Sequence, residues 1–151
     1  MAPGRSVTAI YCDDIRQEVG NKASYMGTYT GLMLVPSLPI TIPKLMVAVN
    51  VYTPREQPFE SLRIRLTKND DLLSEMQIPE EVLRSQPSVP MADLGEEVSV
   101  VFSFIFNLTP LPVADLSKIR IRVQTESEEL KGPALVIKGI EASSVQSTTS
   151  I

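Results

Sequence analysis

The sequence predicts an all-β fold, a single-domain β-sandwich of about eight or nine mostly antiparallel strands. Twelve prolines in 151 residues are many for a helical protein, because proline removes a backbone donor and breaks helix interiors. Segments rich in β-branched and aromatic residues recur between turn signals, several with apolar and polar residues alternating. Amphipathic helical periodicity is nearly absent, which favours an immunoglobulin-like or C2-like sandwich over a βαβ fold.

The length of the chain fits one domain with a core large enough to need no disulfide. We expect the sandwich to span residues 1–142. Residues 143–151 are rich in serine and threonine and are expected to form a flexible C-terminal tail.

The first half of the chain is expected to begin with a strand that ends at Cys12 and is followed by a polar stretch over residues 13–18. Gly20, Asn21 and Lys22 then predict a turn. Apolar residues on both faces of residues 45–52 indicate an inner strand. The other expected elements are strands at 24–29 and 32–35, a proline-punctuated connector at 36–43, a loop at 53–58 and a β-hairpin at 61–78.

The second half is expected to open with a short helical turn over residues 79–84, because Pro79 suits the first helical position and acidic residues follow it. Phe102, Phe104 and Phe106 line one face of the next segment, which predicts the central strand of the core. Further strands are expected at 118–125 and 134–140, after a crossover at 109–117 and a turn at 126–132.

The only cysteine, Cys12, has no partner for an internal disulfide, so the fold does not need an oxidising compartment. The N-terminal residues lack the apolar segment of a secretory signal. The most apolar window, residues 32–51, is interrupted by Pro36, Pro39, Pro43 and Lys44. We therefore expect a cytoplasmic protein that does not bind a membrane.

The absence of histidine removes serine–histidine and cysteine–histidine catalysis and histidine metal ligands. One cysteine cannot build a structural zinc site, and there is neither a phosphate-binding loop nor a dinucleotide fingerprint. We expect a protein that is not an enzyme and needs no cofactor or metal. Its net charge of −4 disfavours indiscriminate binding to nucleic acid.

The first candidate binding site is a polar cluster of Asp13, Asp14, Arg16, Glu18 and Lys22. Its carboxylates are of the kind that bind calcium, that work as a general acid and base, or that contact a partner. The simpler interpretation is turn chemistry with a surface ion pair. A second acidic pair, Asp70 and Asp71, is explained by a hairpin tip.

The second candidate site consists of five basic residues that point outward on two expected strands: Arg63, Arg65, Lys118, Arg120 and Arg122. If these strands share a sheet, an acidic chain has one positive face, able to receive an acidic protein surface or another anion. The alternative is an ordinary solvated face, with the strands apart or with Glu75 or Glu97 interleaved, because like charges directly opposite one another are unfavourable.

A set of short motifs links the chain to a known group of proteins. The motifs are Cys12-Asp13-Asp14-Ile15-Arg16-Gln17-Glu18 with Lys22, Gly27-Thr28-Tyr29, Val35-Pro36 and Pro43-Lys44-Leu45. With them, the chain resembles, from Ile10 to about Ile140, a family of small uncharacterised bacterial proteins, some of them from phages and prophages. The resemblance implies a bacterial or phage cytoplasmic protein and brings no activity with it.

The function expected from these features is a non-catalytic protein-interaction module, in one form a phage or prophage accessory or host-interacting protein. One alternative is a structural component that self-assembles into a symmetric oligomer, as in a virion. Another is a calcium- or ligand-binding sandwich centred on Asp13, Asp14 and Glu18.

Overall fold

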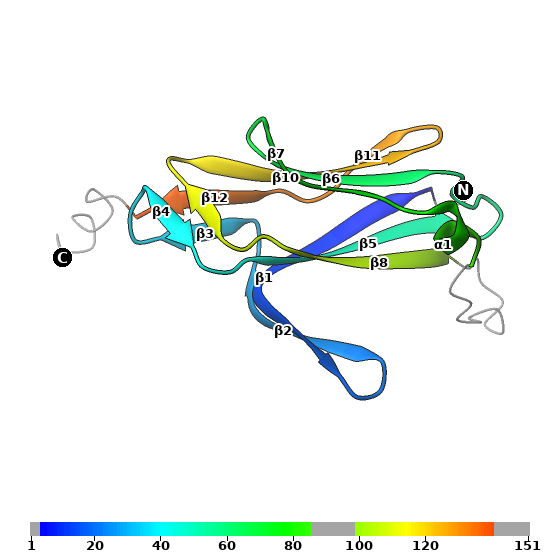
Figure 1. Ribbon diagram of the computed structural model, residues 1–151, viewed down its shortest axis with the longest axis horizontal. Helices are drawn as coiled ribbons and strands as arrows, with labels where there is room; N and C mark the ends of the chain where they lie inside the picture. The colour runs from blue at the N-terminus through cyan, green and yellow to red at the C-terminus, as the bar shows by residue number, and fades with distance from the viewer. Residues whose placement is uncertain (1–3, 86–98, 141–151) are drawn as a thin grey trace.

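The computed structural model describes residues 4–85 and 99–140, which form two β-sheets packed face to face, as Figure 1 shows. The predicted all-β sandwich is confirmed. The elements are β1 (Ser6–Glu18), β2 (Lys22–Tyr29), β3 (Leu32–Val35), β4 (Ile40–Ile42), β5 (Met46–Pro54), β6 (Leu62–Lys68), β7 (Asp71–Gln77), α1 (Glu80–Arg84), β8 (Ser99–Asn107), β9 (Leu111–Val113), β10 (Ser117–Thr125), β11 (Glu129–Lys131) and β12 (Leu135–Gly139).

The first sheet has the strand order β2-β1-β5-β8, and the second has the order β3-β12-β10-β6-β7 with β11 beside β10. A small separate pair joins β4 to β9. The pairings are antiparallel except that of β12 with β3, which is parallel. β5 lies inside its sheet, and β6 and β7 form a hairpin, as the sequence predicts.

The core lies between the two sheets and follows the period-two pattern of the strands. Val47, Val49 and Val51 of β5 are fully buried, and so are the alternate residues of β6 and β10 that face them across the interior. Phe59 and Phe102 add an aromatic contact, with ring centroids 6.1 Å apart. The outward residues of the same strands are free to present polar groups to solvent.

β1 is longer than the sequence predicts. It does not end at Cys12 but continues to Glu18, pairing with β5 over Ser6 to Cys12 and with β2 from Tyr11 onward. Residues 13–28, called the arm below, form a hairpin that leaves the sandwich (Figure 1). Residues 13–18 form a strand although they are polar, because β2 supplies the hydrogen-bond partners of their backbone N–H and C=O groups. A strand paired in this way does not need an apolar face. The turn itself is confirmed, with positive φ at Gly20 and Asn21.

The expectation that residues 98–106 form the central strand is wrong, because β8 ends the order of the first sheet within the described residues. Phe102 and Phe106 face the core, whereas Ile105 on the other face is 42% exposed. Three short strands, β4, β9 and β11, also lie in segments expected to be connectors or turns. Three residues are too few to show a periodicity.

The helical turn after Pro79 is confirmed as α1. The expected tail at 143–151 lies outside the described residues. Within the described part of the chain, no helix combines the length and the apolar character that crossing a membrane requires.

Candidate binding face

The five basic residues singled out in the sequence lie on one face of the second sheet. β6 and β10 are neighbours in that sheet and pair antiparallel. Because Ile64, Leu66 and Ile121 point into the core, the residues that alternate with them point to the opposite side. The structure therefore brings together Arg63, Arg65, Lys118, Arg120 and Arg122.

A sixth cation belongs to the same face and is missed by the sequence reasoning. Lys131 of β11 lies opposite Arg122 in the register of β10 and β11, and it is exposed. Its three-residue strand has no periodic signal, so its direction is visible only in the folded chain. These six residues are called the basic face below.

Three cations of the basic face form a row across neighbouring strands. Arg122 pairs in register with Arg65 on one side and with Lys131 on the other. Directly opposed residues of an antiparallel pair have Cβ atoms about 4.5–5.5 Å apart, so like charges there are destabilising. The row therefore has an energetic cost to the fold.

Two carboxylates reduce this repulsion. Glu75 of β7 lies 3.3 Å from the Nε of Arg65 and 4.0 Å from the Nε of Arg63, and Glu129 lies 3.9 Å from Arg122. The expected interleaving by Glu75 is thus present, whereas Glu97 lies outside the described residues. Exposed ion pairs of this kind contribute about 0–1 kcal/mol each. Two acids do not neutralise six cations, so the face stays positive.

The turn between β6 and β7 holds one end of the basic face in place. The Asn69 backbone N–H donates to the carbonyl oxygen of Lys118 at 2.9 Å, and the Lys118 N–H donates to Asn69 Oδ1 at 3.0 Å. Asn69 has a φ of 54°, a left-handed conformation that asparagine tolerates better than most residues. These two hydrogen bonds fix the position of Lys118 relative to the end of β6.

The polar cluster around Asp13 and Asp14 is spread along the arm. Neighbouring strand residues point to opposite faces, so these two side chains diverge. Asp14 accepts a hydrogen bond from Lys44 at 2.7 Å, which lowers the pKa of Asp14. The Tyr29 hydroxyl donates to Asp13; burial and this bond raise the pKa of Tyr29 to about 12.

The other members of this cluster lie farther along the arm. Glu18 is opposite Lys22 next to the turn, and Arg16 is opposite Ser24. Across residues 4–85 and 99–140, no three histidine, cysteine, aspartate or glutamate side chains converge as metal ligands would.

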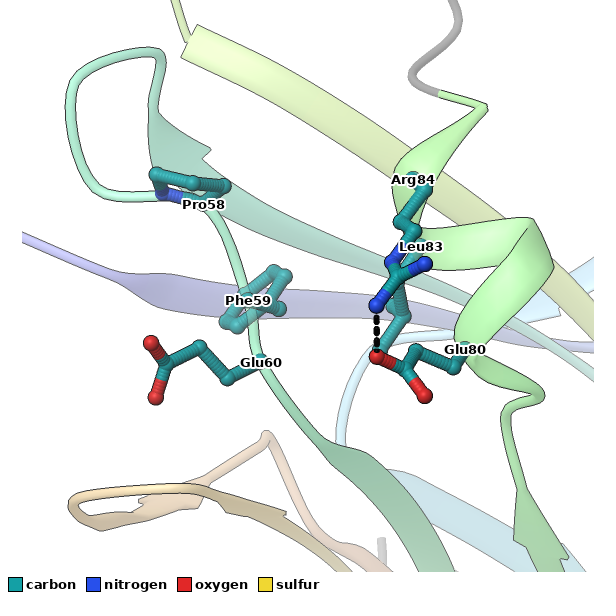
Figure 2. A pocket seen from close by; sticks show the side chains of 6 residues that line it. All are labelled: Pro58, Phe59, Glu60, Glu80, Leu83 and Arg84. Atoms are coloured by element: carbon teal, nitrogen blue, oxygen red, sulfur yellow. Dashed lines mark hydrogen bonds and ion pairs between the residues drawn. The ribbon is translucent and has the colours of Figure 1, made fainter.

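A hollow of about 470 Å³ lies at the end of the sandwich where α1 packs (Figure 2). Glu60 and Glu80 stand on opposite sides of it, and Phe59 and Leu83 lie between them. Arg84 forms an ion pair with Glu80 across one helical turn. Glu80 is therefore engaged in an exposed ion pair within the helix. Of the two carboxylates beside the hollow, only Glu60 is not held in that pair, so the hollow does not present two free carboxylates for acid–base chemistry.

The fold and the candidate site together define a small all-β sandwich protein with one positively charged sheet face. Residues 7–138 match DUF6941, described as a family of unknown function, and the chain belongs to this family. The predicted resemblance to a family of uncharacterised proteins is confirmed to that extent. No curated protein matches the chain.

Proposed function

We propose that this protein is a non-catalytic interaction module and that its basic face receives an acidic surface of another protein. The observation that supports the proposal most directly is the row of Arg65, Arg122 and Lys131, three cations in register on neighbouring strands. Charge complementarity of this kind steers association and selects partners.

The basic face contributes little to the stability of the fold. Its ion pairs are largely exposed, with the side chains of Arg65 and Glu75 48% and 39% accessible. Such pairs stabilise weakly, whereas the opposed cations destabilise. An anion bound across the row would remove the repulsion, so binding and fold stability would be coupled.

A protein surface fits the face better than a nucleic acid does. The chain has 18 acidic against 14 basic residues, and most of the acids within residues 4–85 and 99–140 belong to the arm, the loops or α1 and not to β6, β10 and β11. A long polyanion that extended past the sheet would meet this negative charge, and affinity for nucleic acid depends on neutralised phosphates. A compact acidic patch would contact the cations alone.

The test is a pull-down with the tagged full chain from a lysate of the source organism, read by mass spectrometry. We expect the Arg120→Glu/Arg122→Glu variant to lose the partner that the unaltered chain retains. The matched control is Arg16→Glu/Lys22→Glu, which makes the same charge change on the arm and should keep the partner. Equal recovery by all three proteins would contradict binding through the basic face.

We also propose that the protein is of bacterial or phage origin and acts in the cytoplasm. The motif from Cys12 to Glu18 supports the origin, and the free buried thiol of Cys12 is compatible with a reducing compartment. Cell fractionation with an antibody to the chain tests the location, and recovery in an extracellular fraction would contradict it.

A further inference from the structure

The second sheet has an open edge next to the basic face. β3 ends the strand order and pairs with β12 on one side; across residues 4–85 and 99–140, no strand pairs with its other side. The Val136 N–H donates to the carbonyl of Gly31, and the Ile140 N–H donates to that of Val35. Because backbone groups alternate along a strand, those of Leu32 and Leu34 point to the open edge.

The side chains of the same two residues are apolar and exposed. Leu32 is 46% and Leu34 55% accessible, whereas the intervening Met33 is buried in the core. Leu32 lies opposite Val136, which in turn lies opposite Lys118 of the basic face. The exposed leucines therefore continue the outer surface on which the cations lie.

The two edges of this sheet are protected differently. β7, at the far edge, carries Asp71 and Glu75, and its pairing with β6 contains a register shift of the β-bulge type. Charges and bulges are the usual means by which proteins prevent edge strands from pairing with other chains. The sequence of β3, Leu-Met-Leu-Val, contains neither a charge nor a proline.

The open edge also borders a hollow of about 370 Å³. It is lined mainly by apolar residues of two strands, Met33, Leu34 and Val35 of β3 and Ile40 and Ile42 of β4, together with Tyr29, Pro43 and the charged Asp13 and Lys44. An extended peptide that pairs with an edge strand obtains affinity from main-chain hydrogen bonds and specificity from such a side-chain pocket.

The charges nearby distinguish between two occupants of this edge. Lys138 of β12 lies opposite Leu34, and Lys118 of β10 lies two strands away from Leu32, with Val136 of β12 between them. Pairing with a second copy of β3 would join two positive faces into one sheet and increase the net positive charge of that sheet. A foreign strand with acidic residues on the outer face would instead bring carboxylates to within two strand spacings of Lys138, about 10 Å, where opposite charges still attract at low salt.

We propose that β3 binds an extended acidic segment of a partner protein as an added strand, whose acidic side chains lie on the outer face beside Leu32 and Leu34 and whose apolar side chains point toward the hollow. The inference rests on the proposed function, since it names the kind of segment that the basic face and its edge receive. Pro36 closes the strand after Val35, so the paired stretch is short.

The probe is a synthetic peptide of alternating glutamate and valine, about seven residues long, which spans β3 with room at both ends. Titration into the isotope-labelled full chain, followed by NMR, gives the Kd. We expect the glutamate peptide to bind at least about tenfold more tightly than its lysine counterpart or a version with a central proline. We also expect the Leu32 and Leu34 amides to exchange at least about tenfold more slowly with peptide bound.

Two variants with the same charge change separate strand addition from general attraction to the face. Leu34 and Leu72 are similarly exposed, 55% and 52%, at opposite edges of one sheet. We expect Leu34→Asp to weaken binding of the glutamate peptide at least about tenfold, and Leu72→Asp less than about threefold. Equal weakening by both, with complete loss in Arg120→Glu/Arg122→Glu, would overturn strand addition and leave the proposed function intact.

Three further results would overturn the inference. They are equal binding of the glutamate and lysine peptides, unchanged exchange of the Leu32 and Leu34 amides, and a dimer in sedimentation that Leu34→Asp dissociates. The last result would assign the edge to a second copy of the chain. The exchange measurement uses the unaltered protein, so it does not depend on whether a variant folds.

Discussion

Arg5, just before β1, and Glu126, just after β10, form an ion pair that joins the two sheets. The guanidinium is almost inaccessible, with 2% of the Arg5 side chain exposed. It also donates to the carbonyl oxygens of Gln57 at 3.1 Å and Pro58 at 3.0 Å. A single side chain thus ties the first strand to two loops at one end of the sandwich.

Replacement of Arg5 should destabilise the fold strongly. Arg5→Ala removes the guanidinium donor from the Glu126 carboxylate and from both carbonyl oxygens, and removes a cation that lies 4.6 Å above the centre of the Phe59 ring. Urea unfolding should show a loss of about 3–4 kcal/mol. Arg16→Ala, on the exposed arm, serves as the control and should change stability by less than about 0.5 kcal/mol. Similar losses in both would mean that Arg5 is not a structural link.

The same pair predicts an acid-dependent loss of stability. Burial raises the pKa of Glu126, but hydrogen bonds from Arg5 and from backbone N–H groups outweigh it and lower the pKa to about 2. As the pH falls, the Glu126 carboxylate is therefore protonated near pH 4.5 in the unfolded chain and only near pH 2 in the folded chain. Protonation of the unfolded chain favours unfolding in this range. About 1–2 kcal/mol, allowing for the solvent-exposed part of the side chain, should be lost by pH 2.

Urea unfolding across this pH range isolates the contribution when the unaltered chain is compared with Glu126→Gln. The stability difference between them should be constant above the unfolded pKa and should shrink as the pH falls. A difference that stays constant down to pH 2 would show that the carboxylate gains nothing from Arg5.

Alanine substitutions at Gly20 and Gly27 distinguish the energetic cost of backbone strain from that of a steric collision. Gly20 and Gly27 both have positive φ, 92° and 67°. A Cβ at Gly20 meets open space, whereas one at Gly27 would collide with the Asp13 carboxylate. Thermal unfolding should show Gly20→Ala destabilised by about 1 kcal/mol and Gly27→Ala by about 2–3 kcal/mol. Equal losses would mean that Asp13 moves aside freely.

Arg122→Gln should leave stability unchanged or raise it by up to about 0.5 kcal/mol, because it removes the middle cation of the row with Arg65 and Lys131. Denaturant unfolding at low salt measures this effect. A loss above about 1 kcal/mol would mean that the row stabilises the fold, which would contradict a row of cations that repel one another until an anion binds.

Cys12 should be unreactive in the folded chain. It is 0% exposed, and burial, followed by the nearby Asp13 and Asp14 carboxylates, raises the pKa of its thiol despite a backbone hydrogen bond. A neutral thiol reagent should modify it only as fast as the chain unfolds. Ser24→Cys, on the exposed arm, should supply one fast-reacting thiol in the same assay. Rapid modification of the unaltered chain would contradict the burial of Cys12.

The sequence by itself determined the elements whose pattern is local. Alternation over several residues predicted β5, β6 and β10, and turn chemistry between two apolar runs predicted the hairpin of β6 and β7. The outward direction of Arg63 and Arg120 followed from the same alternation. A strand of three residues, such as β11, shows too little of this pattern, and the polar half of β1 shows none because its stability comes from pairing with β2.

Only the tertiary structure decided which strands are neighbours. Arg65 and Arg122 lie far apart in the chain, and nothing near either residue specifies the other as its partner. The parallel pairing of β12 with β3 and the link from Arg5 to Glu126 are likewise contacts between distant segments. The packing of the whole core selects them, because a strand buries its apolar face in many local environments but completes the interior in one arrangement.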